Sequence, residues 1–235
     1  MFHVRLPRKP GQWIMALTLT TAVVPVALWC RWRFTPECAA QSLHDAAYEG
    51  DLSRVRKLPW WGAPLEAIWD QGWTPLLRAV QRGHFDIVDL LLREGANVRF
   101  RDPWGRTCLH LALFDSDVRD QEPLLRSLLS AGADPNVPDQ NGDTPLLFSM
   151  KTYVDDPGIY EALLASGADP NYRNPQPLPP TTGDWIRFGL GGHLLATEKD
   201  AWRSTPLELA RNMEWVGEEF RLSLIDLLVR HGATE

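Results

Sequence analysis

Apolar and polar residues follow one another in the same order in several stretches of the chain. In the clearest unit, which begins at Gly72, a Thr-Pro pair starts a short apolar run, Gly83 interrupts it, and a second apolar run follows at 85–92. Placed on a helix, the second run has a broad apolar face that one unit cannot bury alone. The pattern therefore predicts pairs of short helices that stack on one another.

Residues that start and end helices recur at fixed points of these units. A threonine hydroxyl can accept a hydrogen bond from the free N–H groups of the first turn, and proline fits the first helical position. A Gly-Ala pair follows the second helix, where glycine suits the left-handed residue past a helix end. The recurring threonines, 33, 37 and 61 residues apart, are Thr74, Thr107, Thr144 and Thr205.

The Thr-Pro-Leu start, the closing Gly-Ala pair and the Asp-x-x-Gly turns together resemble the ankyrin-repeat family, whose unit is a turn followed by two antiparallel helices. The resemblance covers nearly all of residues 41–235 and includes a degenerate first unit at 42–58. The family's motif histidine is found only at His110, and Leu77 and Leu147 replace it in other units. We therefore expect an all-α ankyrin-repeat solenoid of about five helix-turn-helix repeats.

One segment interrupts the repeats. Residues 175–201 lengthen the interval before the last unit, with a proline-rich part followed by a part in which aromatic residues and glycines alternate. Long insertions without a helical pattern are commonly functional or disordered. Trp185 and Phe188 in this insertion either contact a partner or fold back onto the solenoid, and the sequence leaves both readings open.

An uncharged apolar stretch lies near the start of the chain. A basic tail, 1–12, precedes the apolar stretch 13–30, and 31–40 is expected to be a linker. The apolar stretch has about the length that a membrane-spanning helix needs. The larger positive charge before it favours a single-pass helix with the repeats on the extracytoplasmic, periplasmic side, as in a membrane-anchored bacterial protein. The alternative is a cleaved signal peptide that leaves the repeats secreted to the periplasm.

Charge and composition narrow the function. Beyond the first 40 residues, 19 basic and 29 acidic residues give a net charge of −10, so nucleic acid is not expected as a partner. The six histidines and three cysteines lack the spacing of a metal site, and neither a nucleophile motif nor a phosphate-binding glycine loop occurs. We expect no enzyme activity, no cofactor, no metal and no small-molecule substrate.

The resemblance implies binding of a protein partner through the turn tips and the concave face, where aromatic and basic side chains commonly supply the binding energy. An adaptor, an inhibitor or an immunity-type protein would act in this way. The alternatives are a structural scaffold of a membrane complex and an accessory or protective factor for an exported enzyme. The candidate partner-binding residues are Trp69, Trp73, Phe100, Arg101, Trp104, Phe114, Lys151, Trp185, Phe188 and Trp202.

Overall fold

The computed structural model describes residues 36–57, 64–68, 72–114, 121–152, 154–175, 204–213 and 216–234. Within these ranges the chain forms ten α-helices and no extended strand, which confirms the all-helical prediction. None of these helices has the length and apolar character that crossing a bilayer requires. The predicted membrane segment at 13–30 lies outside the described residues, as does nearly all of the insertion at 175–201.

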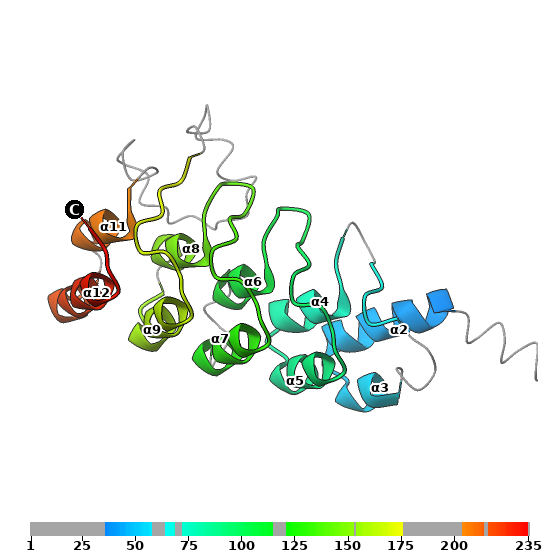
Figure 1. Ribbon diagram of the computed structural model, residues 1–235. Coiled ribbons are helices and arrows are strands. Elements are labelled where there is room, and N and C mark those ends of the chain that lie inside the picture. Colours follow the sequence, from blue (N-terminus) through cyan, green and yellow to red (C-terminus); the bar gives the residue numbers. More distant parts are fainter. Residues whose placement is uncertain are drawn as a thin grey trace, which may run out of the picture.

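The helices form five pairs, each with an inner and an outer member (Figure 1). The two members lie in two parallel rows, and the described parts of the turns between pairs project beyond the inner row. The inner helices are α2 (Pro36–Glu49), α4 (Pro75–Gln81), α6 (Cys108–Phe114), α8 (Pro145–Lys151) and α11 (Pro206–Arg211). The outer helices are α3 (Leu52–Lys57), α5 (Phe85–Arg93), α7 (Gln121–Ser130), α9 (Pro157–Ala165) and α12 (Glu218–Arg230).

Each inner helix packs against the next one, so the inner row runs without a break from α2 to α11. The contact between α8 and α11 shows that the stack resumes after the insertion. At the other end, α2 begins at Pro36, so the second half of the segment expected to be a linker is helical. The described pairs therefore build one continuous solenoid.

Threonine caps start three of the inner helices, as the sequence predicts. Thr74 Oγ1 accepts the Leu77 N–H at 3.3 Å, and Thr144 caps α8 in the same way. Thr205 forms a full capping box, because its Oγ1 accepts the Glu208 N–H at 3.2 Å while its own N–H donates to the Glu208 carboxylate at 2.8 Å. Each of these caps satisfies N–H groups that would otherwise have no partner at the helix start.

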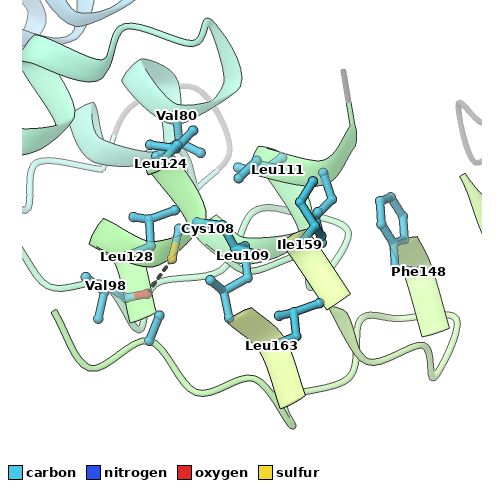
Figure 2. Close-up of a cluster of buried hydrophobic side chains, with 14 of the residues drawn as sticks. Val80, Val98, Cys108, Leu109, Leu111, Leu124, Leu128, Phe148, Ile159 and Leu163 are labelled. Atoms are coloured by element: carbon cyan, nitrogen blue, oxygen red, sulfur yellow. Dashed lines mark hydrogen bonds between the residues drawn. The ribbon is translucent and has the colours of Figure 1, made fainter. Parts of the chain in front are cut away.

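Leucines from both rows fill the space between the inner and outer helices (Figure 2). Leu109 of α6 and Leu128 of α7 are fully buried, and Leu163 of α9 continues the same core into the next repeat. Burying one such side chain stabilises the fold by about 2 kcal/mol. Because each outer helix packs against its own inner helix, and neighbouring repeats share the core, the repeats stabilise one another.

Cys108 stands at the first position of α6, whereas the other four inner helices begin with proline. Its thiol is fully buried and donates to the Val98 carbonyl oxygen at 3.4 Å (Figure 2). Burial raises the pKa of this thiol to about 12, so it stays protonated at physiological pH. Cys108 is therefore a packing residue.

Asparagine side chains join the loops that follow successive outer helices. Asn136 Nδ2 donates to the Gly167 carbonyl oxygen at 2.8 Å, and its Oδ1 accepts the Asp169 N–H at 2.8 Å. Asn171 makes the equivalent two bonds to the loop after α12. We call each such pair of hydrogen bonds an asparagine clamp.

The clamp is missing between the second and third repeats, where Arg99 holds the equivalent position. Within the described ranges, the Arg99 side chain makes no hydrogen bond to the next loop. A hollow of about 330 Å³ lies between the loops at 98–101 and 133–137. The outer helices α5 and α7 barely touch here, whereas the other adjacent outer helices pack together. Among the described repeats, the outer row is therefore loosest at this junction, while the inner helices α4 and α6 pack closely.

Candidate protein-binding surface

A buried histidine ties the third repeat to the fourth. The Thr107 N–H donates to His110 Nδ1 at 3.2 Å, so the ring proton lies on Nε2, which donates to the Asp143 carbonyl oxygen at 2.9 Å. Burial lowers the pKa of His110 to about 4. The ring therefore stays neutral at physiological pH and serves as a fixed strut for the turn that follows.

His44 plays the same part in the first repeat. Its Nε2 donates to the Ala67 carbonyl oxygen at 2.6 Å, and its ring is buried. The prediction that the motif histidine is found only at His110 was therefore wrong. Gln41 stands where other repeats carry the threonine, three positions before the histidine, and α2 continues through that position. His44 Nδ1 therefore lacks the threonine partner that His110 has, and it has no other partner among the described residues. The shared His-x-Ala spacing could have revealed the equivalence.

Buried aspartates shape the turns that project from the inner row. Asp102 Oδ1 accepts the N–H groups of Trp104 and Arg106 at 2.9 and 2.8 Å. Asp102 Oδ2 accepts a third bond from Arg106 Nε at 2.7 Å, with both side chains almost completely buried. The turn is thus closed by an ion pair that leaves Trp104 at its tip.

The next turn has the same backbone but the opposite charge at the equivalent position. Asp139 Oδ1 accepts the N–H groups of Asn141 and Asp143 at 2.8 and 3.0 Å. Here the residue that matches the arginine of the previous turn is Asp143. Burial and the negative charge of Asp143 raise the pKa of Asp139 to about 6.

Asp143 is in turn held by two donors from other elements. Lys151 Nζ at the end of α8 lies 2.6 Å from Asp143 Oδ1, and both side chains are largely buried. Asn174 Nδ2, from the following turn, donates to the same oxygen at 2.8 Å. Lys151 was predicted to contact a partner, but its charge is engaged within the protein.

Aromatic rings and guanidinium groups form a continuous row along the inner side of the first three repeats. The row, which we call the cation–aromatic ladder, consists of Tyr48, Arg78, Trp73, Trp104, Arg106 and Phe114. Its contacts connect α2, α4, α6 and the turns before α4 and α6. Two of these five contacts, Tyr48–Arg78 and Trp73–Trp104, join neighbouring repeats, so the complete ladder exists only when the repeats are stacked.

The distances along the ladder are those of cation–π and edge-to-face contacts. The Arg78 guanidinium carbon lies 5.8 Å from the Tyr48 ring centre and 4.2 Å from that of Trp73. The Trp73 and Trp104 rings meet edge to face at 6.3 Å. The Arg106 guanidinium carbon lies 4.8 Å from the ring centre of Trp104.

At either end the ladder continues into a neighbouring residue. The Arg82 guanidinium carbon lies 4.8 Å from the Tyr48 ring centre, on the face of α4 next to α2. At the other end, the Arg106 guanidinium also stacks on Phe114, whose ring lies parallel to that of Phe148 on α8 at 6.3 Å. The row therefore reaches into the fourth repeat.

Exposure divides the ladder into a base and a surface. Trp73 is 5% exposed, and the Arg106 side chain is 11% exposed. Tyr48 and Trp104 are 46% and 43% exposed, which is high for such large side chains in a packed protein. The exposed rings therefore rest on a fixed, buried base, which suits a surface that binds without rearranging.

The candidate residues predicted from the sequence have different surroundings. Trp104 is exposed at a turn tip as predicted, and Arg101 is exposed while it donates to the Pro138 carbonyl oxygen at 3.3 Å. Phe100 and Phe114 are half-buried against the core. Burial leaves little of the Trp73 ring for a partner. The candidates that lie outside the described residues are Trp69, Trp185, Phe188 and Trp202.

Tyr48 and Arg82 belong to this surface but were not among the predicted candidates. Tyr48 lies four residues after His44, as Phe114 lies four residues after His110. The equivalence of the two aromatic positions becomes visible only once the first repeat is aligned on His44. Arg82 is a surface arginine at the end of α4 whose role depends on a ring from another helix, so no local signal in the sequence identifies it.

Comparison with protein families identifies the repeat. Residues 43–139, which include the first three helix pairs from the latter part of α2 onward, match the model of ankyrin repeats in three copies. This part of the chain consists of ankyrin repeats. The fourth and fifth pairs continue the same stack, and the inner helix of each begins with a threonine cap. Within the described ranges, no three His, Cys, Asp or Glu side chains gather as a metal ion would require.

Several individual proteins are similar to part of the chain. The B-cell lymphoma 3 protein homolog of Mus musculus is 34% identical over 116 residues, 49% of this chain and 25% of that protein. The ankyrin repeat, SAM and basic leucine zipper domain-containing protein 1 of Mustela putorius furo is 34% identical, over 49% of this chain and 24% of its own length. The ankyrin repeat and SOCS box protein 1 of Homo sapiens is 37% identical, over 35% of this chain and 28% of its own length. The matched part thus spans about a quarter of each relative.

Proposed function

We propose that the chain is a protein-binding module that holds a partner against its turn tips and inner helices. The observation that carries this proposal is the exposure of Trp104 and Tyr48 on a buried base of stacked rings and guanidinium groups. Aromatic residues of this kind contribute a large share of binding energy at protein interfaces. Ankyrin repeats, which the chain contains, suggest an interaction module as well.

The surroundings of the site support binding rather than catalysis. The buried polar groups nearest to it, His110 and Asp102, are occupied with hydrogen bonds that hold turns in place. Asp143 is held by Lys151 and Asn174. A binding module that uses this surface would act as an adaptor, an inhibitor or an immunity-type protein.

We also propose that residues 13–30 tether the module to a membrane, with the repeats on the extracytoplasmic side of a bacterial membrane. The support is the uncharged apolar length of this stretch and the basic residues before it. A reporter fused after Glu235 should be active only outside the cytoplasm. Activity only in the cytoplasm would contradict the orientation, and a shortened N-terminus on sequencing would show a cleaved signal instead.

Affinity capture with the full chain from its own membranes tests the binding function. We expect a stoichiometric protein partner, and we expect Trp104→Ala to weaken its binding about tenfold or more, because an exposed aromatic anchor contributes roughly 2 kcal/mol. Leu222→Ala is the matched control, since Leu222 is 56% exposed on the outer helix α12. A third variant without 175–201 asks whether the insertion takes part.

Two results would overturn the proposal. One is the absence of a stoichiometric partner for the full chain, together with turnover of a substrate by the purified protein. The other is an equal loss of the partner on Trp104→Ala and Leu222→Ala, which would place the contact away from the inner row. Circular dichroism of each variant excludes loss of the fold.

A further inference from the structure

One backbone N–H group recurs in four repeats, two residues after the glycine that follows each outer helix. At three junctions, a side chain from the preceding repeat accepts a hydrogen bond from this group. The donors and their acceptors are Asn97 and Glu66, Asp169 and Asn136, and Thr234 and Asn171, at 2.6, 2.8 and 2.7 Å. The equivalent N–H group of Asp134 has no hydrogen-bond acceptor among the described residues.

The carbonyl group that completes a clamp also lacks its partner at this junction. In the complete clamps, the asparagine amide donates to the carbonyl oxygen of Gly167 or Gly232. The equivalent oxygen, on Gly132, accepts no hydrogen bond within the described ranges. The three glycines have φ values of 90°, 88° and 91° in chain order, so the loop turns in the same way at each junction. We call the Gly132 carbonyl and the Asp134 N–H the open clamp.

The hollow of about 330 Å³ gives access to the open clamp. It is lined by Asp134 itself, by the buried Val98 and Ala133, and by the exposed Arg99 and Arg101, so it extends from the core to the surface. Arg99 holds the position that asparagine has at the later junctions. Its side chain carries hydrogen-bond donors but no acceptor, so it cannot accept the Asp134 N–H.

A primary amide matches the two groups of the open clamp. Asn136 reaches both equivalent groups of the next loop, because its amide has an N–H and a carbonyl oxygen on the same edge. A trans backbone peptide points its N–H and its carbonyl in opposite directions and cannot do this. A carboxylate has no donor, and an ammonium group has no acceptor.

We propose that the open clamp binds an asparagine or glutamine side chain of a partner protein. The amide of that side chain donates to the Gly132 carbonyl oxygen and accepts the Asp134 N–H. A protein is the ligand, because two hydrogen bonds exchanged for those of water give little affinity by themselves, and a partner adds contacts around them. The site goes beyond the proposed function, since it uses no residue of the cation–aromatic ladder.

The test selects peptides from a phage-displayed library of random dodecamers on the full chain. Peptides that also bind Arg99→Asn are removed, because in this variant the chain's own amide fills the open clamp. The remaining peptides should share one asparagine or glutamine. In a synthetic peptide, replacing that residue by leucine should weaken binding roughly tenfold, since both hydrogen bonds are lost.

Two control variants separate filling of the open clamp from loss of the arginine. Arg99→Ala removes the same charge without supplying an amide, so the peptides should still bind, within about threefold of the wild-type affinity. Arg93→Asn makes the same exchange on the exposed face of α5 and should leave binding unchanged. Circular dichroism of each variant excludes loss of the fold.

Three results would overturn the inference: no peptide that distinguishes the wild type from Arg99→Asn, selected peptides without a shared asparagine or glutamine, or an equal loss of binding on Arg99→Ala and Arg99→Asn. The captured partner separates this inference from the proposed function. A partner that is lost on Trp104→Ala but retained on Arg99→Asn contradicts the open clamp and leaves the proposed function intact. A partner that is retained on Trp104→Ala but lost on Arg99→Asn supports the open clamp and contradicts binding at the ladder.

Discussion

At the scale of single residues, one exchange of charge between equivalent positions changes how a turn responds to pH. Arg106 neutralises Asp102 in one turn, whereas Asp143 repels Asp139 in the next. The pKa of Asp139 in the folded protein is about 6, above its value near 4 in an unfolded chain. The folded state therefore binds more protons between these values, and this residue lowers the stability as the pH rises from about 4 to about 6.

His110 acts in the opposite direction. Its folded pKa of about 4 lies below the unfolded value near 6.5, so the unfolded chain binds more protons in between. Stability from this residue is lost as the pH falls from about 6.5 to about 4. Over much of this window, the contributions of Asp139 and His110 oppose each other.

The substitution Asp139→Asn separates these two contributions. It removes the carboxyl whose ionisation destabilises the folded state, and it leaves His110 unchanged. The unfolding free energy of the variant should therefore rise more steeply with pH between about 4 and 6 than that of the wild type. Urea unfolding at several pH values in this window measures both slopes. Equal slopes would show that Asp139 does not titrate in this range.

Whether a single contact could be predicted from the sequence depends on how far apart its two residues lie in the chain. The threonine caps at Thr74 and Thr205 involve partners three residues away, and the repeat pattern predicts them. The partners of Asp143 lie 8 and 31 residues away, on α8 and in a turn next to the insertion. A single sequence carries no signal for such pairs, and Lys151 was for that reason assigned to a partner surface.

At the scale of elements, the asparagine clamps decide how firmly successive repeats are joined. Between the first two repeats, Glu66 provides half of a clamp, because its carboxylate accepts the Asn97 N–H at 2.6 Å. Asn136 and Asn171 provide complete clamps at the third and fourth junctions. Among the described repeats, only the junction between the second and third repeats, where Arg99 stands, has no clamp, and the hollow lies at this junction.

Arg99→Asn should restore the missing clamp. The new side chain would reach the Gly132 carbonyl oxygen and the Asp134 N–H as Asn136 reaches the equivalent groups, and we expect the unfolding free energy to increase by about 1 kcal/mol. The matched variant Asn136→Ala removes an existing clamp and should lower it by about 1–2 kcal/mol. The midpoint of urea unfolding reports both. No gain at Arg99→Asn together with no loss at Asn136→Ala, or a loss at Arg99→Asn, would show that the clamp does not control the junction.

At the scale of the whole molecule, the repeat spacing was sufficient to predict a helical solenoid, including the return to the stack after the insertion. The repeat spacing did not predict which aromatic and arginine side chains contact one another on the inner surface. Trp73 and Trp104 belong to successive repeats, and so do Tyr48 and Arg78, so their contacts depend on how repeats are placed against one another. Exposed and buried aromatic residues look alike until that placement is known.

The loose junction predicts that the solenoid unfolds in two blocks. Hydrogen exchange measured by mass spectrometry at increasing urea should show the first two repeats losing protection separately from the last three, because among the described repeats the outer helices pack least there and no clamp joins the loops. In Arg99→Asn the two blocks should lose protection at closer urea concentrations. A single common transition in the wild type would contradict this prediction.

The same junction has a consequence for a chain under tension. A load applied along the solenoid acts on every interface in series, so the interface that separates most readily extends first. The missing clamp places that point between Arg99 and the loop at 133–137. A pull on both ends should therefore open the protein there, and the cation–aromatic ladder would be interrupted between Trp73 and Trp104 while both groups of repeats keep their helices.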